Sequence, residues 1–364
     1  MSLKHIVPTL GLVAALTPAA MAADVGGLTI NGYVDTILEI QSYDEAIAPA
    51  VDNDGEPDDT EIDFTASAQT EIGYKIGANV SANIELYYGD EGAGAGRGTV
   101  DGHTLHVEQA YVEWAVNDQV SLAMGKFHNH LGWEGNDAPE LYRVNWSQVW
   151  NLQNGSLLGA SDVDGNTTGL GVGIAASEQV DIGIYLVDGF WGEDGATGNK
   201  ELADLALGAN VTFTIKGLGL FDIDLAYDMN ASSDEDGEEA DIFALGFNGE
   251  IDALRESNGV LFFWDLFYLD YDVAAGLGFL AGGNLDLKTD TPMSLTANIA
   301  YVDPNDDDDA GGEDDEILEI AIALLTNPTK DENFALNFEG RYIDRGADES
   351  NEFGLFLEAL AVIP

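Results

Sequence analysis

The feature that most constrains this chain is a repeated alternation of apolar and polar residues, over segments of about ten residues. Over residues 28–41 the even positions are mostly apolar or small, and the odd positions are mostly polar. The same pattern recurs over residues 80–88, 293–301 and 336–342. Because successive side chains of a β-strand point to opposite faces, each segment is predicted to be a strand with one apolar and one polar face.

The connections between the predicted strands are of two kinds. Short polar turns join alternate pairs of strands, at residues 77–79, 117–118, 177–179, 216–217, 252–258, 288–292 and 327–333. The intervening connections are mostly longer and more acidic. A soluble β-sandwich also alternates, but only an outer-membrane barrel has a reason to sort its connections between two rims. We therefore predict an all-β fold, a transmembrane antiparallel β-barrel of about 16 strands, with short periplasmic turns, long acidic outer loops and an inward-folded third loop.

The first residues have the pattern of an export signal. A short positive region precedes an apolar run, and residues 20–22 fit the small-residue rule for cleavage. We predict a signal peptide over residues 1–22 and a β-barrel porin domain over residues 23–364. The alternative is an N-terminal membrane anchor, which is disfavoured because Pro8 and Pro18 interrupt a run that is short for a spanning helix.

The charge of the chain excludes some partners. It carries 67 acidic and 12 basic residues, for a formal net charge of −55. Nucleic acid is excluded, because phosphate binding requires Lys and Arg. Intrinsic disorder is disfavoured by the 45% hydrophobic content, so we expect a halophilic source in which salt screens the repulsion. The chain has no cysteine, which excludes disulfides and thiolate metal sites.

Acidic residues gather in the long connections, over residues 52–59, 234–239 and 306–316, whereas the short turns carry Lys216, Arg255, Lys288 and Lys330. The runs 52–56 and 234–238 are similar to calcium loops, but neither has full EF-hand spacing. We predict no cofactor and no dedicated metal site, and leave open loosely bound Ca²⁺ on the outer loops.

The longest connection runs from His128 to about Asn166 and is rich in aromatic and aliphatic residues. A loop of this length is usually functional or disordered, and its composition argues against disorder. We predict that it folds into the lumen and narrows the pore, although an ordered external cap is the alternative. The predicted constriction consists of Trp133, Glu134, Asp137, Glu140 and Arg143. His128 and His130 share one face of an extended segment, which permits a metal pair, but two polar loop histidines are the simpler interpretation.

Further charged residues occupy the alternate strand positions that are predicted to face the lumen. The acidic members are Asp35, Glu39, Asp63, Glu71, Glu85, Asp222 and Asp224, and the basic members are Lys75 and Arg341. Carboxylates in a pore favour cations and repel anions, so we predict a cation preference. The two basic residues would give a transverse field if they lay at one height. Residues 260–271 are apolar on both faces, so their register is ambiguous and they are a candidate subunit contact.

Three stretches resemble one family, the OmpL-like β-barrel porins of Gram-negative outer membranes. They are a Tyr-Val strand over residues 108–114, a Gly-Lys-Phe strand end followed by a Gly-Trp-Glu step over residues 125–134, and residues 187–191, where Asp188 replaces the usual Asn. The resemblance covers residues 28–202 and implies a pore in the outer membrane without a known substrate. The last strand of an outer-membrane barrel commonly ends on an aromatic residue. The last residue of this sequence is instead Pro364.

These observations predict a non-enzymatic outer-membrane porin, a water-filled, cation-preferring channel for passive diffusion of ions and small hydrophilic solutes. Its expected partners are outer-membrane lipids, lipopolysaccharide and other copies of the chain in a homotrimer. The alternative is a surface structural or binding barrel whose acidic loops hold divalent cations. A lipid-hydrolysing barrel has no support, because no Ser, His and Asp grouping stands out.

Overall fold

The computed structural model describes residues 27–43, 60–89, 104–134, 141–153, 166–191, 205–233, 239–271, 274–306, 316–329, 333–346 and 351–363. The strands are β1 (Leu28–Tyr43), β2 (Thr60–Lys75), β3 (Val80–Gly89), β4 (Thr104–Ala115), β5 (Val120–His128), β6 (Asn166–Ala175), β7 (Val180–Val187), β8 (Ala206–Ile215), β9 (Gly219–Ser233), β10 (Glu239–Ile251), β11 (Val260–Tyr271), β12 (Ala274–Leu287), β13 (Met293–Asp306), β14 (Ile317–Thr326), β15 (Phe334–Asp344) and β16 (Glu352–Ile363). Two short helices are α1 (Gln148–Gln153) and α2 (Ala253–Asn258). Within these ranges no helix has both the length and the apolar character needed to cross a membrane.

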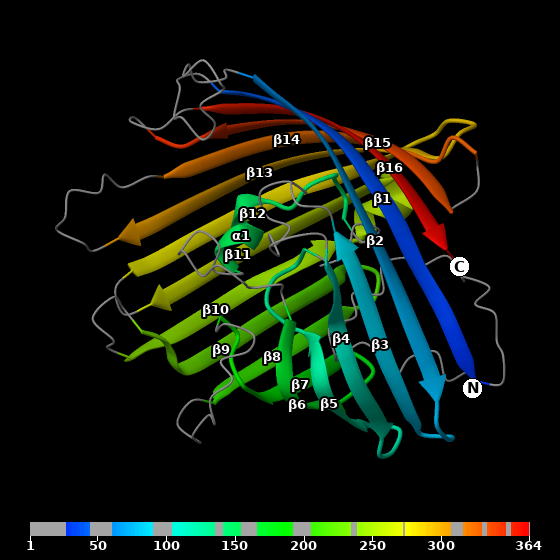
Figure 1. Cartoon of the computed structure of the whole chain (residues 1–364), viewed down its shortest axis with the longest axis vertical. Coiled ribbons are helices and arrows are strands. Elements are labelled where there is room, and N and C mark those ends of the chain that lie inside the picture. The colour runs from blue at the N-terminus through cyan, green and yellow to red at the C-terminus, as the bar shows by residue number, and fades with distance from the viewer. Residues whose placement is uncertain are drawn as a thin grey trace.

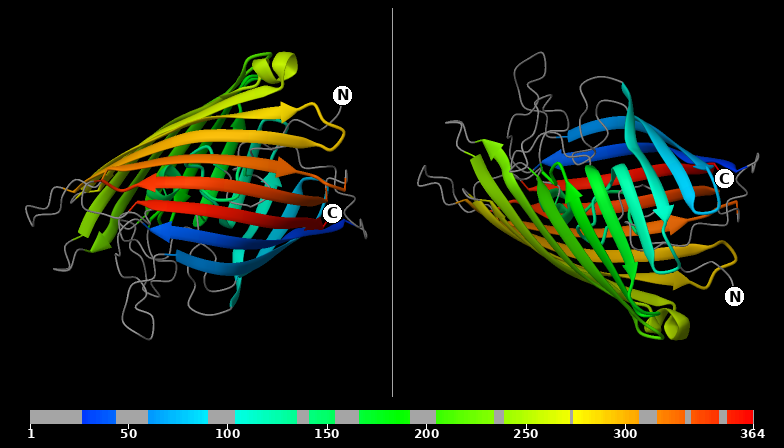
Figure 2. Two further views of the ribbon diagram at one scale, coloured as in Figure 1. Left: turned by 90° about the horizontal axis from the view of Figure 1, so that it is seen from above. Right: turned by 90° about the horizontal axis from the view of Figure 1, so that it is seen from below.

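The strands form one closed antiparallel barrel in which each strand pairs with its neighbours in sequence (Figure 1). The ring closes between the first and last strands, since Val34 of β1 is paired with Ala68 of β2 on one side and with Ala361 of β16 on the other. Figure 2 shows the strands running obliquely around the barrel. The predicted fold class and the predicted number of strands are both confirmed.

The two faces of each strand differ in chemistry. Along β1, Val34 is 41% exposed whereas the next residue, Asp35, is 1% exposed. The same contrast recurs on β9, where Ile223 is exposed and Asp224 is buried, and many large apolar residues are exposed on the other strands. In a closed cylinder one face of every strand points outward and the other inward. The outer surface is therefore apolar, as contact with lipid requires.

The short turns lie where the sequence predicts them, after β2, β4, β6, β8, β10, β12 and β14. Local side-chain chemistry shapes them. In the turn after β4, the Asn117 side chain accepts hydrogen bonds from the backbone N–H groups of Gln119 (2.8 Å) and Val120 (3.1 Å). Connections on the other rim are mostly longer, although residues 234–238, 272–273 and 345–351 form short ones after β9, β11 and β15. The acidic runs 52–59 and 234–238 lie outside the described residues.

The main buried apolar cluster lies inside the barrel, where the long β5–β6 connection meets the wall. Helix α1, which belongs to this connection, contacts β11, β12 and β13 (Figure 1). Gly276 and Gly278 of β12 make room for it, because a Cβ on Gly276 would lie 2.7 Å from Leu152 and a Cβ on Gly278 would lie 3.1 Å from Val149. Glycine in a strand thus allows the helix to approach the wall closely.

Candidate pore constriction

The β5–β6 connection turns toward the wall at Gly132. This residue has a φ of +88°, which favours glycine, and a Cβ here would lie 2.2 Å from the Gln153 side chain. Its backbone N–H donates to Asp224 of β9 (3.4 Å), and the N–H of Trp133 donates to Asp265 of β11 (2.8 Å). The Gln153 amide also donates to Asp265 (2.7 Å). One wall carboxylate therefore holds two parts of the loop that are well separated in sequence.

Aromatic stacking continues the attachment along β11. The ring of Trp133 lies nearly parallel to that of Phe263, with centroids 4.1 Å apart, and Tyr142 stacks on Trp133 at 5.4 Å. Such contacts stabilise beyond the area that they bury. They also explain why residues 260–271 are apolar on both faces, since Phe263 and Phe267 face inward against the loop while Leu266 faces outward. The two-sided pattern of β11 therefore does not require a subunit contact.

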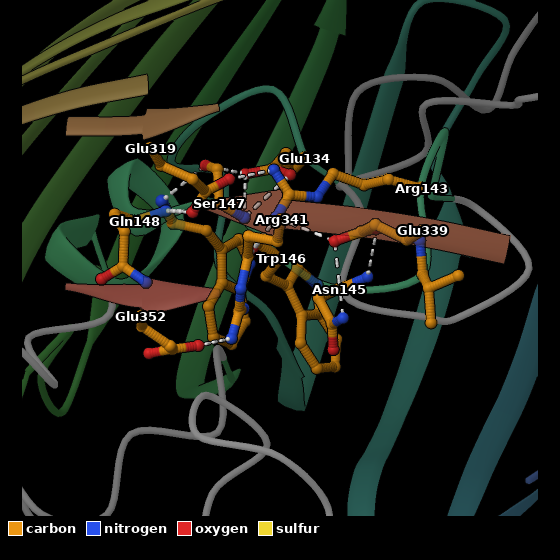
Figure 3. A network of polar contacts seen from close by, with 12 residues as sticks. Glu134, Arg143, Asn145, Trp146, Ser147, Gln148, Glu319, Glu339, Arg341 and Glu352 are labelled. Atoms are coloured by element: carbon orange, nitrogen blue, oxygen red, sulfur yellow. Dashed lines mark hydrogen bonds and ion pairs between the residues drawn. The ribbon is translucent and has the colours of Figure 1, made fainter. Parts of the chain in front are cut away.

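Arg143 is the centre of a polar network between the loop and strands β14 and β15 (Figure 3). Its guanidinium forms ion pairs with Glu319 and with Glu339, the latter at 3.4 Å, and donates to the carbonyl of Trp146 at 3.1 Å. Glu339 also accepts the backbone N–H of Val144 (2.7 Å), and Glu319 accepts that of Gln148 (3.2 Å). Because these ionic groups are buried, their mutual pairing is what makes their burial tolerable.

Glu134 lies beside this network and bonds within the loop. It accepts the Ser147 hydroxyl and the Ser147 backbone N–H, the latter at 3.1 and 3.2 Å. Burial raises the pKa of Glu134 to about 7, although Arg143 and the Ser147 bonds oppose the shift. At neutral pH this carboxyl is therefore divided between its charged and neutral forms.

His130 belongs to the loop, whereas His128 belongs to the strand that precedes it. His130 stacks on Tyr185 with centroids 4.3 Å apart, and its Nε2 lies 3.1 Å from the Leu225 carbonyl. Burial lowers the pKa of His130 to about 4, so the ring is neutral at physiological pH. His128 is the last residue of β5. No group of three His, Asp or Glu residues has metal-binding geometry in the part of the chain that the structure describes.

The structure places the predicted site residues as follows. Trp133 and Arg143 are buried in loop–wall contacts, whereas Asp137 and Glu140 lie outside the described residues. Among the predicted pore-lining residues, Asp35, Glu39, Glu85, Asp224 and Arg341 are buried, Glu71 and Asp222 are partly buried, and Asp63 and Lys75 are exposed. Most of the carboxylates have polar partners on the wall. Gln41 donates to Glu39, Gln109 to Glu85 and Thr212 to Asp222.

Lys75 and Arg341, for which a transverse field was left open on the basis of their shared parity, do not lie at the same height in the barrel. Lys75 is the last residue of β2, beside a short turn, whereas Arg341 lies near the opposite end of β15. Arg341 instead forms an ion pair with Glu352 at 2.6 Å and lies over the ring of Phe356 at 4.9 Å. Alternation fixes which face a side chain occupies, but it does not fix its height along the barrel.

Sequence reasoning missed the wall carboxylates that hold the loop, namely Asp228, Asp265, Glu319 and Glu339. A signal for two of them is present, since Asp265 and Glu319 are single charges within apolar runs. Their neighbours face lipid, so each charge must face inward and find a partner there. Phe190 and Trp191, which lie in the stretch 187–191 that resembles the family, also contact the loop.

Comparison with known proteins gives one family match. The family described as "Putative beta-barrel porin-2, OmpL-like" matches residues 27–214, which include β1 to β7, nearly all of β8, and the β5–β6 loop. No curated protein sequence matches the chain.

Solved structures share the fold at low sequence identity. They include OmpF of Salmonella typhi in complex with daunomycin, with a TM-score of 0.62 and 11% identity over 92% of this chain and 98% of that one. The anion-selective porin of Comamonas acidovorans has a TM-score of 0.61 and 12% identity, covering 92% and 99%. The trimer form of OmpT, an outer-membrane protein of Vibrio cholerae, has a TM-score of 0.53 and 12% identity, covering 92% and 99%. At this identity the similarities concern the fold alone.

Proposed function

Because the chain belongs to the OmpL-like β-barrel porin-2 family, we propose that it forms a water-filled, cation-preferring channel for passive diffusion of ions and small hydrophilic solutes. Family and fold together identify an outer-membrane porin. The proposal adds the selectivity and the part that the β5–β6 loop plays in it.

The observation that carries the cation preference is the imbalance of charge among inward-facing and loop side chains. In the described ranges, eleven acidic side chains are buried, against two arginines, Arg143 and Arg341. Both arginines are already paired with glutamates. An interior of this kind attracts cations and repels anions, because its negative charge is not compensated.

The anion-selective structural neighbour does not count against this proposal. It shares the fold at 12% identity, and selectivity depends on which side chains line the lumen rather than on the fold. The relevant charges are those of this chain.

We further propose that the β5–β6 loop narrows the lumen. Its attachment to the inward-facing residues Asp224, Asp265, Glu319 and Glu339 supports this role. The inward-facing Asp63 on the β2 wall is exposed and so leaves a carboxylate open to the lumen. We expect cations to pass between the loop and that wall.

The decisive experiment is a planar-bilayer recording of the folded mature protein across a KCl gradient. We expect single-channel steps and a reversal potential with the sign of a cation-selective pore. The selectivity should weaken as salt rises from about 0.1 M to 1 M, because the Debye length falls from about 10 Å to 3 Å. A reversal potential of the opposite sign would overturn the cation preference, and folded protein without conductance would overturn the channel itself.

We also propose a homotrimer, which the trimer form of a structural neighbour supports. Binding of Ca²⁺ to the acidic outer loops stays a prediction, because those loops lie outside the described residues.

A further inference from the structure

A second connection, the segment 188–191 after β7, also packs inside the barrel. It starts from a firm attachment to β6. The Asp188 N–H donates to the Thr168 carbonyl (2.9 Å), the Thr168 N–H donates back to the Asp188 carboxylate (3.1 Å), and the Thr167 hydroxyl donates to the Gly189 carbonyl (2.6 Å). The backbone of the segment is therefore fixed where it leaves the wall.

The next two residues are held by one wall carboxylate. Asp228 of β9 accepts the backbone N–H groups of Phe190 (2.8 Å) and Trp191 (3.4 Å). Both aromatic side chains are buried, at 2% and 4% exposure. A carboxylate that accepts two backbone donors is a strong and directional attachment, so these two rings have little freedom of orientation.

Phe190 contacts the first part of the β5–β6 loop. Its ring meets that of His130 edge-on, with centroids 5.4 Å apart, and His130 also stacks on Tyr185. Gly208 of β8 makes this contact possible. A Cβ there would lie 2.5 Å from His130 and 2.6 Å from Phe190.

Trp191 contacts the last described part of the same loop. Its indole N–H donates to the backbone carbonyl of Gln153, the final residue of α1, at 2.6 Å. The Gln153 side chain donates to Asp265, which also accepts the N–H of Trp133. Segment 188–191 thus contacts the loop near both ends of its described portion.

We propose that segment 188–191 is a brace that fixes the position of the constriction loop, with Trp191 as a positioning residue that sets the width of the pore. The inference rests on the proposed channel function. Ordering a loop of about forty residues carries a large cost in conformational entropy. Contacts near both ends of the loop lower its conformational entropy, so less entropy is lost when the rest of the loop docks. The buried bond from Trp191 to Gln153 ties the end of α1 to this segment, in addition to the bonds that Asp265 and Glu319 form with the helix.

The test compares two variants with a matched control. Trp191→Phe keeps an aromatic ring but removes the N–H donor, and Asp228→Asn keeps the shape of the residue that holds both backbone groups. Trp264→Phe is the control, because Trp264 packs against Phe221, Phe247 and Phe262 on the outer face of the barrel. Folding of each variant is checked by heat-modifiable migration on gels.

Liposome swelling with sugars of increasing size gives the readout of pore width, and bilayer recording gives open-channel noise. In Trp191→Phe we expect about fivefold more undocked loop, since one net hydrogen bond changes an equilibrium by about that factor. The variant should therefore admit sugars that the wild type excludes and should fluctuate more in current. Asp228→Asn should change in the same direction, and Trp264→Phe should match the wild type.

Trypsin cleavage after Arg143 provides a readout that needs no conductance, because Arg143 is 4% exposed while the loop is docked. Faster cleavage in Trp191→Phe supports the brace. Suppose that the wild type conducts and that both variants match it in the largest sugar admitted, in current noise and in the rate of trypsin cleavage. This result would overturn the brace and leave the proposed channel unaffected. If the wild type does not conduct, the channel fails, and the cleavage rate still decides whether the brace exists.

Discussion

At the scale of single residues, the protein makes unusual use of its carboxylates. Asp224 and Glu85, which the alternation selects as inward-facing, are both buried. What parity does not predict is that Asp224, Asp265, Glu319 and Glu339 accept hydrogen bonds from the loop, because the partners lie more than ninety residues away in sequence. A charge attached in this way contributes to loop docking as well as to the field in the lumen.

Arg143 gives the sharpest residue-level prediction. Replacing it as Arg143→Gln leaves Glu319 and Glu339 buried without their cation, and breaking a buried pair in this way costs about 3–5 kcal/mol. The loss is measured as a change in the free energy of unfolding, by denaturant titration of the detergent-folded protein followed by tryptophan fluorescence.

Arg345→Gln is the matched control for this prediction. Arg345 also pairs with a glutamate, Glu352, but at 3.6 Å and with 28% of its side chain exposed. Exposed pairs contribute about 0–1 kcal/mol, so its effect should be small. Equal losses in the two variants would contradict the importance assigned to burial around Arg143.

At the scale of elements, the strands were predictable from the sequence, and the contacts of the loop with the wall were not. Alternation is a local signal, and it identified β1, β3, β13 and β15 directly. Helix α1 has six residues, too few for a helical period to show. The pairing of α1 with β12 brings together residues that no local pattern relates, although glycines at 276 and 278 mark a strand face that something approaches closely.

Those glycines provide an element-level prediction. In Gly276→Val the added side chain would meet Leu152, since even a Cβ would lie 2.7 Å from it. Relief of this overlap moves α1 away from the wall and toward the pore axis. We expect a lower single-channel conductance, measured in planar bilayers under the conditions used for the wild type.

Gly340→Val serves as the comparison, because a Cβ on Gly340 would meet only Leu355, at 3.8 Å, on the outer face. Its conductance should equal that of the wild type. An unchanged or larger conductance in Gly276→Val would show that α1 does not face the conducting path.

At the scale of the whole molecule, the closed barrel and its strand number followed from the alternation and from the sorting of turns. The oligomeric state did not. The apolar inner face of β11, once a candidate subunit contact, is covered by the protein's own loop. The trimer proposal therefore depends on the outer surface, and no sequence pattern distinguishes outer residues that meet lipid from those that meet another subunit.

The trimer proposal predicts a defined cross-linking result. Amine-to-carboxyl cross-linking of the protein in native outer membranes should give dimer and trimer bands and none larger, and native mass measurement in mild detergent should give three copies. Dilution with excess lipid before cross-linking is the control for accidental encounters. Persistence of a monomer in both measurements would contradict the proposal.

The pairing of β1 with β16 has a consequence for biogenesis. One edge of β1 has no backbone hydrogen-bond partner until β16, the last strand, has been made. Within a bilayer, water is not present to replace that partner. A chain truncated before β16 would therefore have two unpaired strand edges, one on β1 and one on β15. We therefore expect a chain without β16 not to insert stably, because β1 and β15 would each keep one unpaired edge in the bilayer.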